Sequence, residues 1–447
     1  MSQIRKTLTL LSLSLVLGTW IFFYVNTPPL GKGDSISKRR LVATPFLSKF
    51  STLPCLVLSK SPNPFQDKKE LTPSEKTLSA KPLFRVRTAA SFKSCGLQNL
   101  GVDELVWGNS SDSGDKQALL RAIEQSIRYL ISSDATAAYQ RYPVTGITKE
   151  RVFRSLVRFR QLVLASRSAA ELEAAVKREF VFYQSVGGDG LGNVLFTAYY
   201  EPVYMASRVP TPEYRYPIYR RPPNLDSWPK PHPTRKQLEG EDGLQGSKGR
   251  LRGLELFWLR SRMEAYLAQI QGSARLLLTD GKQTSVGFAD NTAYNYTSIG
   301  RELVNDGKLS LEKSTLPNIL RYFNKYPQEL NKYLPRDKSF VFFKETHGGP
   351  AMGSINVPLT ASRSIATDKS LMPPGALALI HAPIPFKNAK GEMEFRTVSR
   401  YVLDQDTGGA IKGPGRVDYF LGTGAVAGDR AGVTVADGQL YYLLLKQ

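Results

Sequence analysis

Residues 404–424 read DQDTGGAIKGPGRVDYFLGTG, and this glycine-rich stretch decides what fold the chain is expected to have. Four glycines separate Asp406 from Asp418, and Asp418 lies within the apolar run VDYF. Glycine lets a backbone turn sharply and approach a ligand closely. Aspartate is unfavourable inside an apolar strand, and burial there would raise its pKa, as a general acid requires. On the residues alone, a general acid at Asp418 and a turn aspartate at the start of a strand both remain open.

The triplet at 406–408 reads DTG, the short signature of aspartic proteases. That mechanism needs two aspartates sharing one proton, each normally from its own copy of the triplet. The chain has one copy, so a protease would have to be a homodimer. His232, His347 and His381 lie far apart without metal-ligand spacing, and no nucleophile elbow supports Ser-His-Asp chemistry. Carboxylates are therefore the candidates for catalysis, and neither a metal nor a cofactor is expected.

Short apolar or alternating runs, broken by Gly, Pro, Asn and Asp, extend outward from this stretch. They begin after Gly187 with NVLFTAYYEPVY and end with LYYLLL near the C-terminus. Many short strands separated by turn signals favour a barrel or a sandwich. Residues 114–185 contain three runs with apolar residues at helical spacing, and a further helical stretch is predicted at 298–333. The pattern predicts a mainly β fold with helices preceding it.

The N-terminal region differs from the rest in charge and composition. Residues 1–95 hold 15 Lys and Arg against 4 Asp and Glu, so they carry +11 of the chain's net charge of +21. Within residues 1–25 a basic start precedes a long apolar run, which predicts a signal peptide or, as we favour, an uncleaved signal anchor. Residues 26–95 are rich in Ser, Pro, Lys and Thr and are predicted to form a disordered basic tether.

The excess of positive charge favours polyanionic partners such as anionic lipids and cell-wall polymers. The sequence contains no helix-turn-helix signature, RNP-like motif or zinc spacing, so nucleic acid is not an expected partner. Cys55 and Cys95 lack CxxC spacing, which argues against a metal site. A disulfide between them is chemically allowed in an oxidising compartment.

Three further motifs lie before the glycine-rich stretch in the chain. They are FTAYYEP at 196–202, DGKQTSVGFADNTAYNY at 280–296 and GPAMGSINVPLTASRSIATD at 349–368. Together with DTGGAIKG and RVDYF, they resemble the membrane-bound lytic transglycosylase A family over roughly residues 196–445. The resemblance implies a double-psi β-barrel that is interrupted by an inserted second β-rich domain.

The resemblance also implies domain boundaries. A helical region and the first part of the barrel would occupy residues 96–204, and the inserted domain residues 205–344. The C-terminal part of the barrel, called the 3D domain, would occupy residues 345–447. A groove between the two domains would hold a glycan strand.

The 3D domain of that family is named for three aspartates, which match Asp368, Asp406 and Asp418. By motif match Asp418 takes the place of the catalytic aspartate, and the other two become supporting acids. The implied reaction cleaves the β-1,4 bond between N-acetylmuramic acid and N-acetylglucosamine in peptidoglycan. The sugar's own C6 hydroxyl attacks C1 and leaves a 1,6-anhydromuramoyl end. One carboxyl then serves first as acid and next as base, whereas ordinary glycosidases need two carboxylates.

Six residues of the same motifs are candidates for glycan binding: Tyr199, Tyr200, Glu201, Tyr294, Tyr296 and Lys412. The tyrosines are equally suited to core positions, because aromatic residues are common in strands. We expect a monomer in the cell envelope, on the periplasmic side, which is either membrane-anchored or secreted; the resemblance also allows an outer-membrane location. Two rivals remain: a non-catalytic wall-binding protein of the expansin or barwin type, and a glycoside hydrolase that uses two of the aspartates.

Overall fold

The computed structural model describes residues 81–86, 100–108 and 113–447. The predicted anchor, most of the predicted tether and both cysteines lie outside these residues. Inside the predicted tether, strand β1 (Leu83–Arg85) pairs antiparallel with strand β2 (Phe180–Ser185). The tether prediction is wrong at β1, because these residues make their backbone hydrogen bonds within a sheet. None of the described helices is long and apolar enough to cross a membrane.

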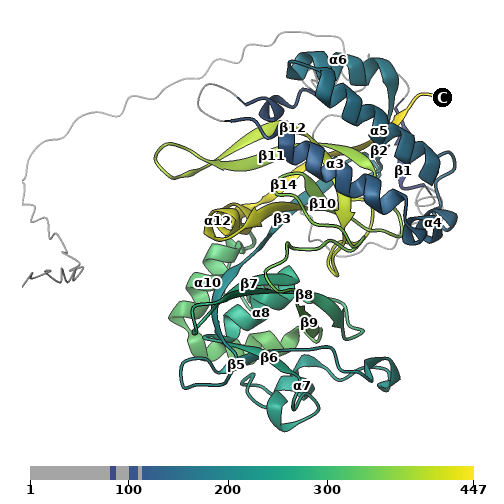
Figure 1. Ribbon diagram of the computed structural model, residues 1–447. Helices are drawn as coiled ribbons and strands as arrows, with labels where there is room; N and C mark the ends of the chain where they lie inside the picture. The colour runs from purple at the N-terminus through teal and green to yellow at the C-terminus, as the bar shows by residue number, and fades with distance from the viewer. Residues whose placement is uncertain (1–80, 87–99, 109–112) are drawn as a thin grey trace, which may run out of the picture. The chain divides into compact units, whose positions relative to one another are not determined.

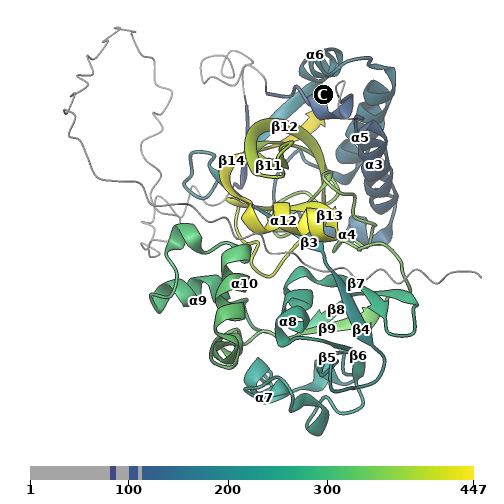
Figure 2. The ribbon, with the colours of Figure 1, turned by 90° about the vertical axis from the view of Figure 1, so that its left-hand side faces the viewer.

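Six strands close into a barrel, which Figure 2 shows end-on. They are β3 (Val194–Glu201), β10 (Ser364–Ala366), β11 (Leu377–Lys387), β12 (Met393–Asp406), β13 (Arg416–Thr423) and β14 (Val435–Leu445). The order around the barrel is β14, β11, β12, β10, β13, β3, and β3 pairs back to β14. The pairs β10–β12 and β13–β3 are parallel, and the other neighbours are antiparallel. The predicted β-rich barrel is confirmed.

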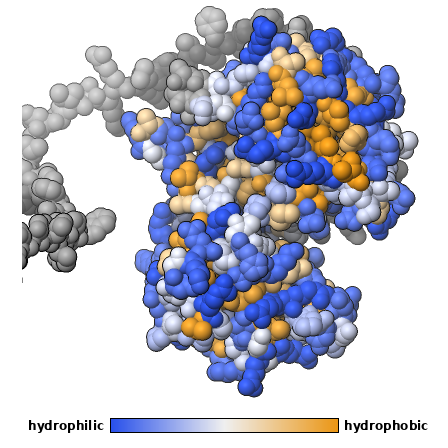
Figure 3. Space-filling view, viewed as in Figure 1, coloured by the Kyte–Doolittle hydropathy of each residue, from blue (hydrophilic) through white to orange (hydrophobic). Residues whose placement is uncertain are grey.

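Within the described residues, four α-helices precede the barrel in the chain and lie beside it in Figure 1. They are α3 (Lys116–Leu130), α4 (Ser133–Gln140), α5 (Lys149–Ala165) and α6 (Ala169–Glu179). A serine or threonine side chain caps the N-terminus of α4, α5 and α6 by accepting a backbone N–H. The apolar faces of α3 and α5 share one buried core with the barrel strands. Hydrophobic residues also reach the surface of the part of the molecule that carries these helices (Figure 3). Ile131 and Leu164 are among the exposed large hydrophobic residues.

The third predicted helical run is shorter than expected. Helix α6 ends at Glu179, and the following six residues, FVFYQS, form β2, which pairs with β14. Aromatic and β-branched residues favour a strand when a partner strand is present. The helical prediction was therefore wrong at 180–185, because the decisive pairing lies more than 250 residues away along the chain.

A second sheet forms between β3 and β10 in the chain and has its own apolar cores. Its strands are β4 (Val203–Ser207), β5 (Tyr216–Tyr219), β6 (Glu255–Leu259), β7 (Ser273–Leu278), β8 (Gln283–Asn291) and β9 (Val341–Glu345). Their order is β5, β6, β4, β7, β8, β9. The helices of this part are α7 (Arg235–Glu239), α8 (Arg262–Gln271), α9 (Ile299–Asn305), α10 (Leu316–Lys325) and α11 (Leu330–Tyr333), so the helical stretch predicted at 298–333 is confirmed. This insertion is the β-rich interruption of the barrel that the resemblance implied.

The register of the barrel strands gathers residues from three motifs. Ala366 of β10 lies between Asp406 of β12 and Asp418 of β13. Asp418 in turn pairs with Thr197 of β3, which comes from the motif FTAYYEP. Thr197 thus becomes a near neighbour of Asp418, which lies 221 residues later in the chain, while Asp406 and Asp418 lie on the two sides of Ala366.

Candidate active site

Asp418 is the third residue of β13, partly buried, with its carboxylate turned toward β3. The Thr197 hydroxyl donates to Asp418 Oδ1 over 2.8 Å, and no other hydrogen bond reaches this carboxylate from the described residues. Burial raises the pKa of Asp418 to about 6, although the Thr197 hydrogen bond and the Arg416 charge oppose the rise, and Asp406 adds to it. A carboxyl with this pKa holds its proton in mildly acidic solution and can still release it near neutrality.

Asp406 is the last residue of β12 and has more hydrogen bonds. The Tyr199 hydroxyl donates to its Oδ2 over 2.7 Å, and the backbone N–H groups of Ser354 and Thr407 donate to its Oδ1 over 2.9 and 2.8 Å. Burial nevertheless raises the pKa of Asp406 above its ordinary value. Burial and the charge of Asp406 also raise the pKa of Tyr199, so its hydroxyl stays protonated and acts as a donor.

Asp368 follows β10 and differs from the other two aspartates. Ser370 donates to its Oδ1 from the backbone (3.1 Å) and from the hydroxyl (2.6 Å), and the Gly413 N–H donates to its Oδ2 over 2.8 Å. Burial alone would raise the pKa of Asp368, but these hydrogen bonds and the charge of Lys412 hold it below the ordinary value. This carboxylate stays ionised, and it fastens the glycine-rich turn that leads into β13.

A buried ion pair that the sequence analysis missed supports the same turn. The Lys369 ammonium bonds the carboxylate of Asp404 and the backbone carbonyl of Asp406. Asp404 is fully buried and also accepts hydrogen bonds from Thr367 (2.7 Å) and Tyr442 (2.6 Å). The position of Lys369 directly after Asp368 was the available signal, but a lysine in a loop more often lies on the surface.

Two more residues beside Asp418 were missed. Thr197 belongs to the motif FTAYYEP, but nothing in the sequence of a strand indicates that its threonine will bond an aspartate 221 residues later. Arg416 precedes Asp418 by two residues and therefore lies on the same face of β13. One of its guanidinium nitrogens is 3.4 Å from the Thr197 hydroxyl oxygen.

The candidates for glycan binding on β3 contact different parts of the structure, because successive strand residues face opposite ways. Tyr199 faces Asp406, and its ring lies 5.2 Å from that of Phe420. Tyr200 packs instead against helix α12 (Ala425–Val433), and a Cβ on Gly428 would come within 2.8 Å of its ring. The carboxylate of Glu201 is buried, with hydrogen bonds from Arg275 (2.9 Å) and Thr423 (2.7 Å). Of these three residues, the structure brings Tyr199 to the aspartates.

The candidates of the insertion lie between β8 and α9. Tyr296 approaches the glycine-rich turn, since a Cβ on Gly409 would be 3.9 Å from the Tyr296 Cβ. Tyr294 donates from its hydroxyl to the carbonyl of His232. Lys412 is exposed on the turn itself. The described residues contain no cluster of three or more His, Cys, Asp or Glu that could hold a metal ion.

Comparison with known proteins places this geometry in context. A family model described as the MltA specific insert domain matches residues 195–344, and a second, described as the 3D domain, matches residues 363–444. Curated relatives are membrane-bound lytic murein transglycosylase A of Escherichia coli K12 and of Vibrio cholerae, and a homolog in Buchnera aphidicola. All three are 32% identical to this chain. The match to the E. coli protein covers 56% of this chain and 65% of that protein. The corresponding shares are 58% and 68% for V. cholerae and 60% and 70% for B. aphidicola. The match thus spans slightly less than two thirds of the E. coli relative.

Solved structures agree with the sequence comparison. A membrane-bound lytic murein transglycosylase from Agrobacterium tumefaciens is similar with a TM-score of 0.60 and 27% identity, covering 74% of this chain and 93% of that one. E. coli MltA with bound chitohexaose is similar with a TM-score of 0.58 and 26% identity, covering 73% and 89%. The likeness therefore extends over both the barrel and the insertion.

Proposed function

The chain belongs to the membrane-bound lytic murein transglycosylase A family, and from that premise we propose that it cleaves peptidoglycan glycan strands. The bond broken is the β-1,4 bond between N-acetylmuramic acid and N-acetylglucosamine, and the product carries a 1,6-anhydromuramoyl end. The observation that carries this proposal is the Asp418 carboxyl, which is partly buried, has one hydrogen-bond donor and has a pKa raised to about 6.

Asp418 performs both proton transfers. Protonated Asp418 gives its proton to the glycosidic oxygen as the bond to C1 breaks. The resulting carboxylate takes the proton of the C6 hydroxyl, whose oxygen forms the new bond to C1. Because the nucleophile belongs to the same sugar, it has the high effective molarity of an intramolecular reactant. The Thr197 hydrogen bond stabilises the carboxylate between the two steps.

The other aspartates support this cycle. Asp406 is already engaged by Tyr199 and by two backbone N–H groups, which suits an acceptor that fixes its surroundings better than a group that exchanges protons. Its negative charge also favours the protonated form of Asp418. Asp368 stays ionised and holds the turn through Gly413.

The glycan is bound by tyrosines near the turn. Tyr199, Tyr296 and Tyr294 offer aromatic ring faces of the kind that stack on sugars, since the hydroxyls of Tyr199 and Tyr294 already donate to Asp406 and to the His232 carbonyl. The exposed Lys412 adds a positive charge. The bound chitohexaose of the E. coli relative supports a glycan ligand of this type. Tyr200 and Glu201 join β3 to its neighbours and act on the glycan only indirectly.

One assay separates this function from its rivals. Purified peptidoglycan is digested with the full chain, and the released muropeptides are identified by mass spectrometry. Anhydro ends support the lytic transglycosylase, reducing ends indicate a hydrolase with two carboxylates, and binding without release indicates a wall-binding protein.

The names of the relatives also support a location in the cell envelope. We place the enzyme on the periplasmic side, held by residues 1–25, although these residues lie outside the described part of the chain. Cell fractionation with N-terminal sequencing tests this location. A soluble mature chain that starts near residue 26 would overturn the anchor.

A further inference from the structure

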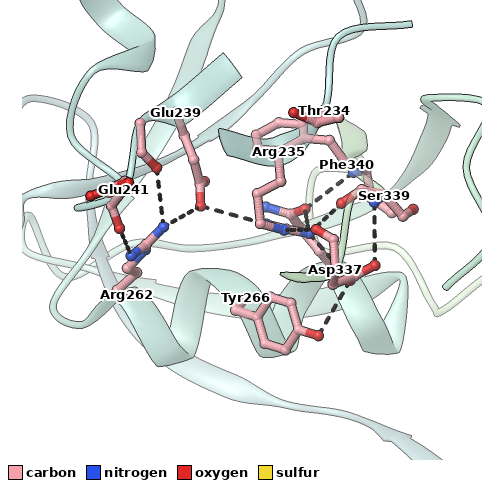
Figure 4. A network of polar contacts seen from close by, with 12 residues as sticks. Thr234, Arg235, Glu239, Glu241, Arg262, Tyr266, Asp337, Ser339 and Phe340 are labelled. Atoms are coloured by element: carbon pink, nitrogen blue, oxygen red, sulfur yellow. Dashed lines mark hydrogen bonds and ion pairs between the residues drawn. The ribbon is translucent and has the colours of Figure 1, made fainter. Parts of the chain in front are cut away.

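The segment 292–298, called here the tyrosine segment, joins β8 to α9 without regular structure and carries Tyr294 and Tyr296. An irregular segment has no ladder of backbone hydrogen bonds to fix it, so its conformation depends on contacts with other parts of the chain. A buried polar network of the insertion, which includes Arg235 and Asp337 (Figure 4), supplies contacts of this kind, since Asp337 accepts from the Thr297 N–H. Burying the several charges of this network costs free energy unless each is well paired, which suggests that the network has a function.

The first half of the tyrosine segment is held by its backbone. The Thr292 N–H donates to the Phe340 carbonyl, and the Thr292 hydroxyl accepts from the Phe340 N–H, both over 2.9 Å. The Ala293 N–H donates to His232 Nδ1 over 3.2 Å, and the Tyr294 hydroxyl donates to the His232 carbonyl.

The second half depends on one carboxylate. Asp337 is fully buried, and its Oδ1 accepts from the Thr297 N–H over 3.1 Å and from the Ser339 N–H over 3.2 Å. Its Oδ2 accepts from the Tyr266 hydroxyl over 3.3 Å. Asp337 therefore binds the backbone directly after Tyr296.

Arg235 neutralises this carboxylate and closes the network. Its guanidinium lies 3.7 Å from Asp337 Oδ2 and donates to the carbonyls of Asp337 (3.1 Å) and Ser339 (2.6 Å). The same group lies over the ring of Tyr266, 4.9 Å from its centre. Figure 4 shows Arg235 between Asp337 on one side and Glu239 on the other.

We propose that Asp337, together with Arg235, is a positioning residue that holds the tyrosine segment against the glycine-rich turn and thereby sets the affinity for glycan. This inference rests on the proposed function, because it takes Tyr296 and Tyr294 as glycan contacts. The link to the barrel is short, since Tyr296 Cβ lies within van der Waals reach of a Cβ on Gly409. The pair lies in the insertion and touches none of the catalytic aspartates among its described contacts, so it acts on binding and leaves proton transfer unchanged.

The test compares two apolar substitutions of similar size in the same network. Asp337→Leu removes the acceptor of the Thr297 N–H. Glu239→Met removes a carboxylate of similar burial that bonds Arg262 (3.0 Å) and lies 3.7 Å from Arg235 but contacts no residue of the tyrosine segment. Asp337→Leu takes one partner from Arg235, and Glu239→Met takes one from Arg262 and one from Arg235, so both lower the melting temperature.

For Asp337→Leu in the full chain we expect KM on peptidoglycan and Kd for chitohexaose to rise about tenfold, with kcat within about twofold of wild type. For Glu239→Met we expect wild-type KM and Kd. Asp337→Asn keeps an acceptor for the Thr297 N–H but loses the charge that faces Arg235, so its Kd is expected to lie between those of wild type and Asp337→Leu, about threefold above wild type.

Equal KM and Kd in Asp337→Leu and Glu239→Met would overturn the proposal. Should Asp337→Leu fail to fold, Asp337→Asn decides: a measurable rise in Kd supports positioning, and a wild-type Kd overturns it. If the wild-type chain releases no anhydro ends, the proposed function fails, while the Kd series still tests whether Asp337 controls binding.

Discussion

The barrel and the insertion each contain an aspartate whose pKa burial raises, but the two differ in how their charge is compensated. Asp337 of the insertion is fully buried, accepts three hydrogen bonds and lies beside Arg235. Asp418 of the barrel is partly buried and accepts one hydrogen bond. Burial alone therefore does not identify an acid. A carboxyl that keeps few partners and some access to solvent is suited to exchange a proton, whereas a fully bonded one is suited to hold structure.

The barrel itself repeats this contrast. Asp404 is two residues from Asp406 on β12, yet it is fully buried and bonded to Lys369, Thr367 and Tyr442. We regard it as structural for the same reason as Asp337. The predictions below separate the two kinds of carboxylate.

The largest effect is expected for Asp418→Asn. The amide keeps the shape of the side chain but cannot donate and recover a proton, so turnover should fall by about 10²–10⁴. Release of anhydro-muropeptides measures this loss, and chitohexaose binding by the same variant should be retained. Asp429→Asn, on the surface of α12, serves as the control. Turnover near the wild-type rate in Asp418→Asn would remove this residue from the mechanism.

Lys369→Met should reduce stability more than any substitution at Asp418. It leaves the Asp404 carboxylate buried without its cation, which costs about 3 kcal/mol or more. Lys387→Met, which breaks the exposed pair with Asp429, should cost about 0.5 kcal/mol. Urea denaturation of both variants measures the difference in free energy of unfolding. Equal losses would mean that Asp404 is not the compensated carboxylate described above.

The pH dependence should expose the raised pKa of Asp418. The acid that we propose acts in its protonated form, so turnover should fall as pH rises through about 6, by up to tenfold for each further pH unit. Because the pKa is higher in the folded than in the unfolded chain, stability from this group is present below about pH 4 and is lost as pH rises to about 6. Asp418→Asn should remove that part of the pH dependence of unfolding. A turnover profile that stays flat through pH 6 to 8 would contradict the assignment.

Asp406→Asn should have the smallest effect of the changes predicted here, and its effect is on turnover. The amide oxygen still accepts hydrogen bonds, but the charge that favours protonated Asp418 is lost, so turnover should fall only about tenfold. The alkaline limb of the pH profile should also move to lower pH. A loss as severe as that of Asp418→Asn, together with reducing ends, would instead indicate a pair of catalytic carboxylates.

Much of the architecture followed from local patterns. Helices α5 and α6 were expected from apolar residues at helical spacing, and their threonine and serine caps fix where they begin. Alternating apolar runs with turn signals indicated strands, and the glycine-rich stretch with its two aspartates indicated the site. These features depend on residues within a few positions of one another, so a sequence displays them directly.

The tertiary structure decided what depends on distant pairing. β2 is a strand because it pairs with β14, although the sequence had predicted a helix there. β1 is a strand because it pairs with β2, although the sequence had predicted a tether there. The register of β3 against β13 turned Tyr199 toward Asp406 and left Tyr200 on the opposite face. The same register gave Asp418 its one donor, Thr197, while the connection after β10 gave Asp404 its cation, Lys369. Closing a barrel buries every strand against partners that are far apart in the chain, and this burial, which no local pattern encodes, separates Asp418, with its raised pKa and its one donor, from the fully bonded Asp404.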